Sequence, residues 1–397
     1  MHLARTAAAK SKPVSAHLAL LLIFAVVLIA VYFHVAVSGA NPGWDFEHYY
    51  AGAQIVRAGL GHQLYDISVQ HRFETQYGHG PGAVFDYPAA TSLLYWPTTF
   101  LTLNCAFFAW TVFSMIIAWF SVWLLVRSLK IAADPTWPIF LAMAFYPLQN
   151  SFIAGQVDCV LLLAFTLSFA ALNANKPFAA GLALALALIK FHLVLPVVFF
   201  MLLRREWHFL TGFFAGSTIV AAVCFAVSGM AQLTAYPRLL LIMQSLPRSG
   251  FAPWLMPNLR GLIALLSGRE LPFWLLAAIS ILALLWAATR SRELHIGTAF
   301  SLAITITLAT AYHLYVYDLV LLIIPLRVLA RRTPPWDVAK IIIFGLLVVP
   351  LLPWLATVHG LTALLVIPVL FLIPALIQSA HPKSAPPFDA RAVAPAT

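Results

Sequence analysis

A carboxylate surrounded by aromatic side chains follows the first hydrophobic run of the chain. Asp45 lies in the segment NPGWDFEHYY, residues 41–50, directly after the apolar stretch 18–37. At a membrane–water boundary, such a group could act as a general base toward a lipid-linked substrate. It could also cap the helix that is expected to begin near Phe46. The residue types leave both interpretations open, and one carboxylate could fill both roles.

Further ionisable side chains fall in or beside apolar runs, where burial is costly. Membrane-embedded charges usually face the bundle interior or a wet cavity and indicate function by default. The residues concerned are Asp158, Lys190, His192, Arg260, His313 and Asp318. A structural ion pair between Asp158 and Lys190 is the alternative interpretation, and for His313 it is an ordinary interfacial histidine.

Composition indicates the class of protein. Hydrophobic residues make up 62% of the 397 residues and charged residues 9%, against a usual charged share of about 25%. A soluble chain could not hide this much apolar surface, so the sequence predicts a polytopic, all-α membrane protein. Cys105, Cys159 and Cys224 all lie in apolar runs, which favours neither a disulfide framework nor a zinc site.

The apolar runs predict about twelve transmembrane helices of about 20 residues each. The run 178–203 is too long for one span and too short for two full ones, so we expect two short helices broken around residues 190–192. Interfacial or re-entrant segments are expected at 89–103 and 258–268. The other expected spans are 18–37, read as an uncleaved anchor, 104–126, 136–153, 157–174, 207–229, 272–290, 296–311, 314–330, 338–357 and 361–379.

The basic residues predict the orientation of these spans. With the N-terminus in the cytoplasm, 16 of the 23 Lys and Arg residues fall on the cytoplasmic side, as the positive-inside rule requires. The formal charge of +10 is therefore attributed to topology rather than to nucleic-acid binding. Residues 1–380 are expected to form one transmembrane domain with outer loops at 38–88 and 230–257. The tail 381–397 is expected to be disordered and cytoplasmic.

The first outer loop is expected to contain a helix. The spacing of apolar residues over 46–60 indicates a helix that lies in the interface plane, packs on the bundle, or does both. The motifs GxGxxG, GxxxxGK[ST], HExxH and GxSxG are missing from the sequence, so a group donor need not be a nucleotide.

An ordered set of short motifs resembles glycosyltransferase family 87. The motifs are Asp45 with Tyr49-Tyr50, Gly59, Leu64-Tyr65-Asp66, Phe85-Asp86-Tyr87-Pro88, Gly155-Gln156-Val157-Asp158, Lys190 with Pro196, Asn258-Leu259-Arg260-Gly261, and Tyr317-Asp318-Leu319 with Pro325. They occur in the family's order. One departure is Ala89, where the family often has a second proline.

The resemblance implies a GT-C-type bundle of about twelve membrane helices with extracytoplasmic loop helices, in a bacterial inner or plasma membrane. It implies a hexosyltransferase of the cell envelope that moves a sugar from a polyprenyl-phosphate donor to a glycolipid or glycan acceptor. In the well-understood members this sugar is mannose. Membrane lipids, but no nucleic acid, are expected as further partners.

The resemblance assigns a role to Asp45, and the chemistry of a phosphate leaving group suggests roles for other residues. Asp45 becomes the general base, and His313 orients Asp45 or binds phosphate. Lys190, His192 and Arg260 are expected to bind the donor phosphate. The expected supporting residues are Tyr49, Tyr50, Gln156, Asp158, Asn258 and Asp318. A phosphate leaving group needs no general acid, and cations can stabilise its charge, so neither a metal ion nor another cofactor is expected.

Two other functions compete with this one. A transporter or flippase of lipid-linked sugars would also have a broken helix and buried charges, and a scaffold subunit would have many spans. A translocation pathway, however, places its charges near the middle of the bilayer. Asp45 stands in an outer loop, which favours the enzyme.

Overall fold

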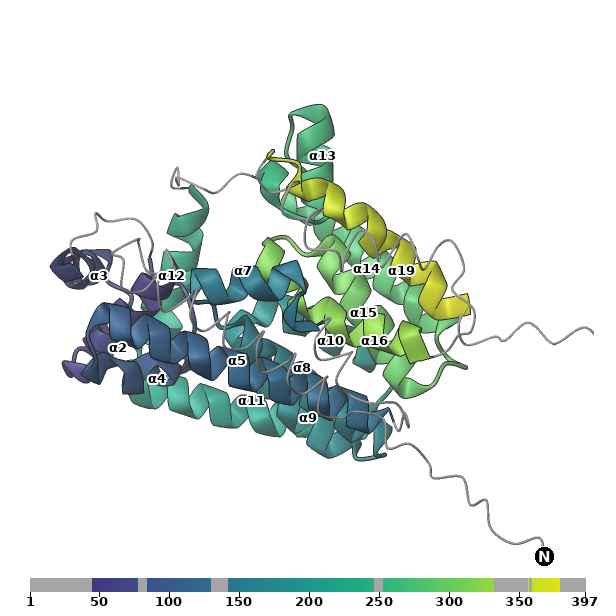
Figure 1. Ribbon diagram of the computed structural model, residues 1–397, viewed down its shortest axis with the longest axis horizontal. Helices are drawn as coiled ribbons and strands as arrows, with labels where there is room; N and C mark the ends of the chain where they lie inside the picture. Colours follow the sequence, from purple (N-terminus) through teal and green to yellow (C-terminus); the bar gives the residue numbers. More distant parts are fainter. Residues whose placement is uncertain are drawn as a thin grey trace, which may run out of the picture.

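The computed structural model describes residues 45–77, 84–129, 142–245, 253–331, 356 and 359–378 (Figure 1). Within these ranges every regular element is an α-helix or a 3-10 helix (η), and no strand occurs. In chain order they are α2 (Phe46–Arg57), η1 (Gly61–Gln63), α3 (Ile67–Glu74), η2 (Thr75–Tyr77), α4 (Ala90–Tyr95), η3 (Trp96–Phe100), α5 (Leu103–Ser128), α7 (Tyr146–Ala154), α8 (Asp158–Asn173), α9 (Pro177–Ala185), η4 (Leu186–Lys190), α10 (Phe191–Leu203), α11 (Trp207–Ser228), α12 (Ala231–Ser245), η5 (Pro253–Leu255), α13 (Leu259–Ser267), α14 (Phe273–Arg290), α15 (Ile296–Thr310), η6 (Val316–Leu322), α16 (Ile323–Arg331), η7 (Thr362–Leu365) and α19 (Val366–Gln378).

Several of these elements have the length and apolarity of membrane spans. Four described runs qualify, namely α5, residues 177–203, α11 and α14. Large apolar side chains on them face outward, such as Phe214 and Trp274, which are 63% and 69% exposed. Such exposure is costly in water and normal against lipid. The chain is therefore an all-α membrane protein, as the sequence predicts.

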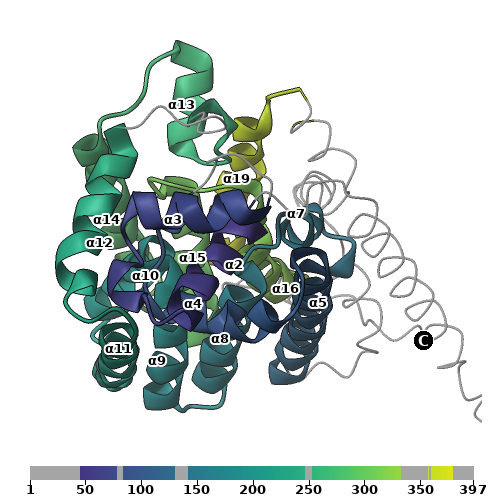
Figure 2. The same cartoon turned by 90° about the vertical axis from the view of Figure 1, so that its left-hand side faces the viewer.

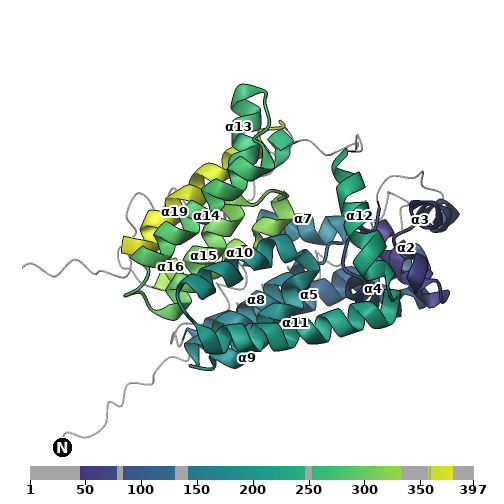
Figure 3. The same cartoon turned by 180° about the vertical axis from the view of Figure 1, so that it is seen from behind.

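The run 177–203 folds back on itself. Helix α11 packs beside α9 (Figure 3). The two helices are so close that a Cβ at Gly181 would overlap the backbone oxygen of Phe209, and one at Gly212 would overlap that of Phe178. The start of α11 therefore lies at the start of α9, and α10 must return the chain to that end. This confirms the predicted break, and it places Lys190 at the inner apex of the two half-helices.

The helices of the first loop gather at one end of the bundle (Figure 2). Helix α2 buries Phe46, Tyr49, Tyr50 and Ala53 and contacts α4 and η3, so it packs on the bundle. Helix α3 begins where the Asp66 carboxylate accepts a hydrogen bond from the backbone N–H of Ser68 at 2.9 Å, as an N-cap does.

The expected spans differ in how regular they are. Those at 104–126, 157–174, 207–229, 272–290 and 296–311 correspond to α5, α8, α11, α14 and α15. The stretch 314–330 is not one α-helix but η6 followed by α16, and Asp318 accepts a hydrogen bond from the backbone N–H of Tyr315 at the start of η6. Residues 89–103 and 258–268 form short helices, as expected for segments that do not span.

Some expectations lie wholly or mostly outside the described residues. They are the spans 18–37 and 338–357, the first part of 136–153, and the tail 381–397. Of 136–153 the structure describes α7 and the residues just before it. The count of twelve spans and the single domain 1–380 stay predictions.

Several helices begin inside the bundle rather than at its end. Helix α8 has 16 residues and is about 24 Å long at 1.5 Å per residue, shorter than a hydrocarbon core of about 30 Å. Its end reaches the start of α15, where Gly297 lies close to Asn173. Lys190, just before α10, pairs with Asp158 at the start of α8 and with Asp318 in η6, so the starts of these three elements meet within the molecule.

Candidate active site

A tight turn between α7 and α8 connects the polar groups of the site. Gly155 ends α7 with a positive φ of 69°, a conformation that favours glycine. A Cβ at this position would come 2.6 Å from Cβ of Phe46, so the turn lies directly against the start of α2. This close approach brings Gln156 to Asp45.

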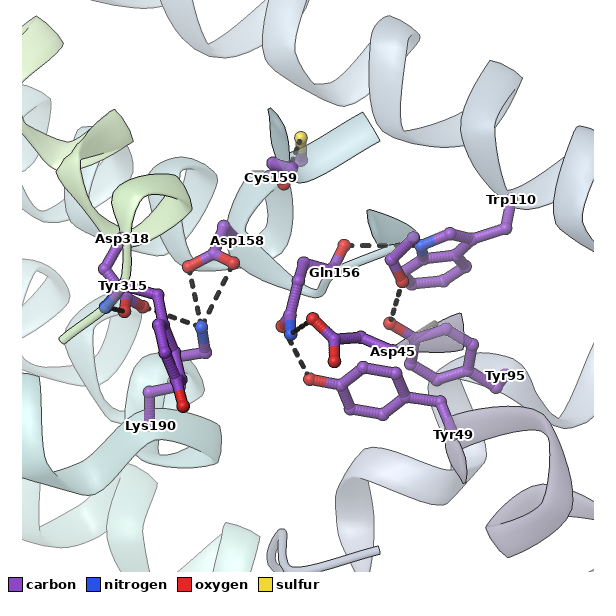
Figure 4. A network of polar contacts seen from close by, with 12 residues as sticks. Asp45, Tyr49, Tyr95, Trp110, Gln156, Asp158, Cys159, Lys190, Tyr315 and Asp318 are labelled. Carbon is purple, nitrogen blue, oxygen red and sulfur yellow. Dashed lines mark hydrogen bonds and ion pairs between the residues drawn. The ribbon is translucent and has the colours of Figure 1, made fainter. Parts of the chain in front are cut away.

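Asp45 directs its carboxylate into the site instead of capping α2. Its side chain makes no capping hydrogen bond, and its Oδ2 accepts a hydrogen bond from Nε2 of Gln156 at 2.7 Å (Figure 4). The hydroxyl of Tyr49 donates to Oε1 of the same amide at 2.7 Å. The capping interpretation of Asp45 is therefore wrong, and Asp45, Tyr49 and Gln156 form one hydrogen-bonded chain.

Aromatic rings enclose this chain. Tyr95 stacks on Tyr49 at 4.5 Å and on Trp110 at 3.8 Å between ring centroids. The Tyr95 hydroxyl donates to the carbonyl of Gly155 at 3.2 Å, and Nε1 of Trp110 donates to that of Gln156 at 3.3 Å. The sequence did not reveal Tyr95 or Trp110, because each lies in an apolar segment where an aromatic residue is ordinary packing.

The environment of Asp45 suits a base that works near neutral pH. Burial raises the pKa of Asp45 to about 6, while the Gln156 hydrogen bond and the positive charge of Lys190 act in the opposite direction. A catalytic base is most effective when its pKa lies near the working pH. Asp45 is thus ionised at neutral pH and still basic enough to take a proton.

A buried ion cluster lies on the other side of the turn. Lys190 Nζ is 2.9 Å and 3.0 Å from the two oxygens of Asp158 and 2.7 Å from Oδ1 of Asp318, and the three side chains are at most 3% exposed. The ammonium also lies 4.7 Å from the centroid of the Tyr317 ring. The expected alternative of an Asp158–Lys190 ion pair is confirmed, with Asp318 as a further partner. The cluster joins α8, η4 and η6.

The other residues expected to bind phosphate or to assist Asp45 lie near the loop that precedes η6. The rings of His192 and His313 meet edge to face, with their centroids 5.9 Å apart. Arg260 is 2% exposed and donates to Oε2 of Glu270 at 2.6 Å and to the carbonyl of Tyr312 at 2.9 Å. Glu270 is 55% exposed; nothing in the sequence connects it with Arg260 beyond a separation of ten residues.

Two of the expected supporting residues join elements of the fold. Tyr50 donates to the carbonyl of Leu101 at 2.7 Å. Asn258 caps α13 by accepting from the backbone N–H of Gly261 at 2.9 Å, and its amide donates to the carbonyl of Ala311 at 2.8 Å. Within the described ranges, no group of three or more His, Cys, Asp and Glu side chains is arranged to hold a metal ion.

Comparison with known proteins gives the family. The sequence profile of glycosyltransferase family 87 matches residues 85–325, more than half of the chain. The chain belongs to this family.

One curated relative extends the comparison. The chain is 24% identical over 294 residues to an alpha-(1->3)-arabinofuranosyltransferase of Corynebacterium glutamicum strain ATCC 13032. The match covers 68% of this chain and 65% of the relative, so the chain spans less than two thirds of that protein's length. No solved structure matches the chain.

Proposed function

We propose that the protein transfers a sugar from a polyprenyl-phosphate donor to a hydroxyl group of a glycolipid or glycan acceptor, with Asp45 as the general base. The observation that carries this proposal is the partly buried carboxylate of Asp45, held by Gln156 in a cage of aromatic rings.

The reaction is a single displacement. Asp45 takes the proton of the acceptor hydroxyl, and the acceptor oxygen forms a bond to the anomeric carbon. The bond between that carbon and the phosphate oxygen breaks, and its electron pair leaves with the polyprenyl phosphate. With one carboxylate as base and none as nucleophile, the configuration at the anomeric carbon inverts, as in inverting glycosidases.

The departing phosphate is assigned to Arg260, His192 and His313. Arg260 offers the planar donor geometry that suits phosphate. Its carboxylate partner Glu270 is more than half exposed, so it is the partner that a phosphate can displace. Lys190 is already paired with two carboxylates, and it acts on the site through the charge of the cluster.

The transferred sugar is assigned to the hexose class, with mannose as the first candidate from the family's well-understood members. The C. glutamicum relative is named as an arabinofuranosyltransferase, which makes a pentofuranose the second candidate. Both donors present the same polyprenyl phosphate, so the base and the phosphate subsite serve either one.

Reconstitution with defined donors tests the proposal. Purified protein in lipid nanodiscs would receive polyprenyl-phosphate mannose or polyprenyl-phosphate arabinofuranose, with octyl mannoside and octyl arabinofuranoside as acceptors. Mass spectrometry is expected to detect an extended glycoside and free polyprenyl phosphate. Movement of labelled donor across sealed vesicles, with no glycoside formed from any pair, would favour the transporter and contradict the proposal.

A further inference from the structure

Gln156 lies between the base and the rest of the bundle. Resting on the proposed role of Asp45, we propose that Gln156 is a positioning residue whose amide fixes the Asp45 carboxylate by Oδ2 and leaves Oδ1 to receive the acceptor's proton. The contact that carries this inference is the 2.7 Å hydrogen bond from Nε2 of Gln156 to Asp45.

The hydrogen bonds around the amide set its orientation. A tyrosine hydroxyl near neutral pH can donate, and here the Tyr49 hydroxyl donates to Oε1 of Gln156 at 2.7 Å. The NH₂ group must then face Asp45, whose ionised carboxylate can only accept. The amide therefore matches the proton-free form of Asp45, the form that a base must have before the reaction.

The backbone of the same turn is held from two further sides. Trp110 donates to the carbonyl of Gln156, and Tyr95 donates to that of Gly155. Two residues farther on, Asp158 is paired with Lys190 at 2.9 Å. Side chains of α4, α5 and η4 thus fix a turn of four residues, and a buried amide on such a turn has little freedom to move.

This arrangement gives Gln156 a kinetic role distinct from packing. Its hydrogen bond stabilises the ionised carboxylate and so holds the pKa of Asp45 below the value that burial alone would give. Without the bond, the carboxylate would rotate, and its pKa would rise. The acceptor's proton would then meet a base that is misplaced and more often protonated.

The test compares Gln156→Leu with Gln54→Leu. Gln54 is a matched control because it lies on α2 and, among the described residues, its side chain donates to the carbonyl of Thr99 at 3.1 Å. Gln156→Leu is expected to lower kcat about 10²-fold, to leave KM for the donor unchanged, and to move the acidic limb of the pH profile to higher pH. Gln54→Leu should show the wild-type limb.

A second variant covers the case in which Gln156→Leu does not fold. Tyr49→Phe keeps the ring that stacks on Tyr95 and removes the hydroxyl that orients the amide, so the same shift of the limb is expected with a smaller loss of kcat. An unchanged limb in the folded variants would overturn the role of Gln156. If Asp45→Asn also stayed active, the proposed base itself would be wrong, so the two failures are distinguishable.

Discussion

Asp45 must be ionised to act as a base, and its environment sets the pH at which this occurs. Because burial raises its pKa to about 6, the rate should fall about tenfold for each pH unit below that value and level off above it. The check is kcat/KM of sugar transfer measured across this range. A rate that stays constant well below pH 6 would exclude Asp45 as the titrating base.

Arg260 is expected to govern use of the donor. Arg260→Lys keeps the positive charge but loses the planar pair of N–H donors, so KM for the polyprenyl-phosphate donor should rise while KM for the acceptor does not. Steady-state kinetics with each substrate varied in turn would measure this. Arg269→Lys is a suitable control, since Arg269 is exposed. Equal donor KM in both variants would place the phosphate elsewhere.

Lys190 is expected to affect folding rather than donor binding. Removing it would leave Asp158 and Asp318 buried without their cation, and breaking a buried ion pair costs about 3–5 kcal/mol. Lys190→Ala is therefore expected to lose folded protein, seen as a lower thermal midpoint and aggregation on size exclusion. A stable Lys190→Ala protein with weak donor binding would instead support direct phosphate contact by Lys190.

Glu74, at the end of α3, carries another buried carboxyl group. It is 6% exposed, and neither of its oxygens has a hydrogen-bond partner within the described residues. Burial, and then the charge of Glu47, raise its pKa from 4.5 to about 7. The folded state thus holds an extra proton between these values, and the free energy of unfolding falls as pH rises through this window.

Glu74→Gln should remove this dependence. The variant is expected to be more stable than the wild type near pH 8 and to change less between pH 5 and pH 8. Thermal unfolding in detergent at the two pH values measures both effects. If the variant kept the pH dependence of the wild type, Glu74 would be charged and solvated at both pH values.

At the scale of elements, the close contact of α9 and α11 shapes the site, because it forces α10 to turn back at Lys190. A side chain at Gly181 would overlap the backbone of α11. Gly181→Val should therefore cost at least about 1–3 kcal/mol, the usual range for overpacking, and weaken sugar transfer as Lys190 shifts. Ala179→Val, at an exposed position of α9, is the control. Equal thermal midpoints would contradict the close packing.

The sequence predicted elements better than contacts. Long apolar runs predicted α5, α8, α11, α14 and α15, because burial in lipid requires length and apolarity that composition reveals directly. It also predicted the break at Lys190, since a cation is costly within an apolar run. The 3-10 geometry of η6 was not predicted, because an apolar run does not distinguish a 3-10 helix from an α-helix.

In the site, too, the sequence predicted residues but not their contacts. Asp45, Asp158, Lys190 and Asp318 stood out because charges are rare in this chain. Their pairing did not, because it depends on how α8, η4 and η6 meet in space. Tyr95 and Trp110 gave no signal at all, since an aromatic ring that donates a hydrogen bond looks in sequence like one that only packs.

At the scale of the whole molecule, the orientation in the membrane is still a prediction. The first loop should face the extracytoplasmic side and the tail the cytoplasm, because 16 of 23 basic residues then lie inside. Single cysteines at positions 62 and 385, in a chain lacking Cys105, Cys159 and Cys224, would report this. Position 62 is suitable because His62 is exposed, whereas a cysteine at the nearby Asp66 would remove the cap of α3.

An impermeant thiol reagent is expected to label position 62 and not position 385 in intact cells. Labelling at 385 alone would place Asp45 in the cytoplasm, where nucleotide sugars are available, and would remove the main physical support for a lipid-linked donor. Labelling at both positions would require an odd number of spans.

The most direct measurement compares wild type and Asp45→Asn in sugar transfer from a polyprenyl-phosphate donor, with both proteins purified into nanodiscs. Asparagine preserves the size of the side chain but cannot accept the acceptor's proton. Transfer should fall about 10²- to 10⁴-fold, the usual effect of losing a general base, while thermal stability is retained. Near-normal turnover by Asp45→Asn would contradict the proposed mechanism at its centre.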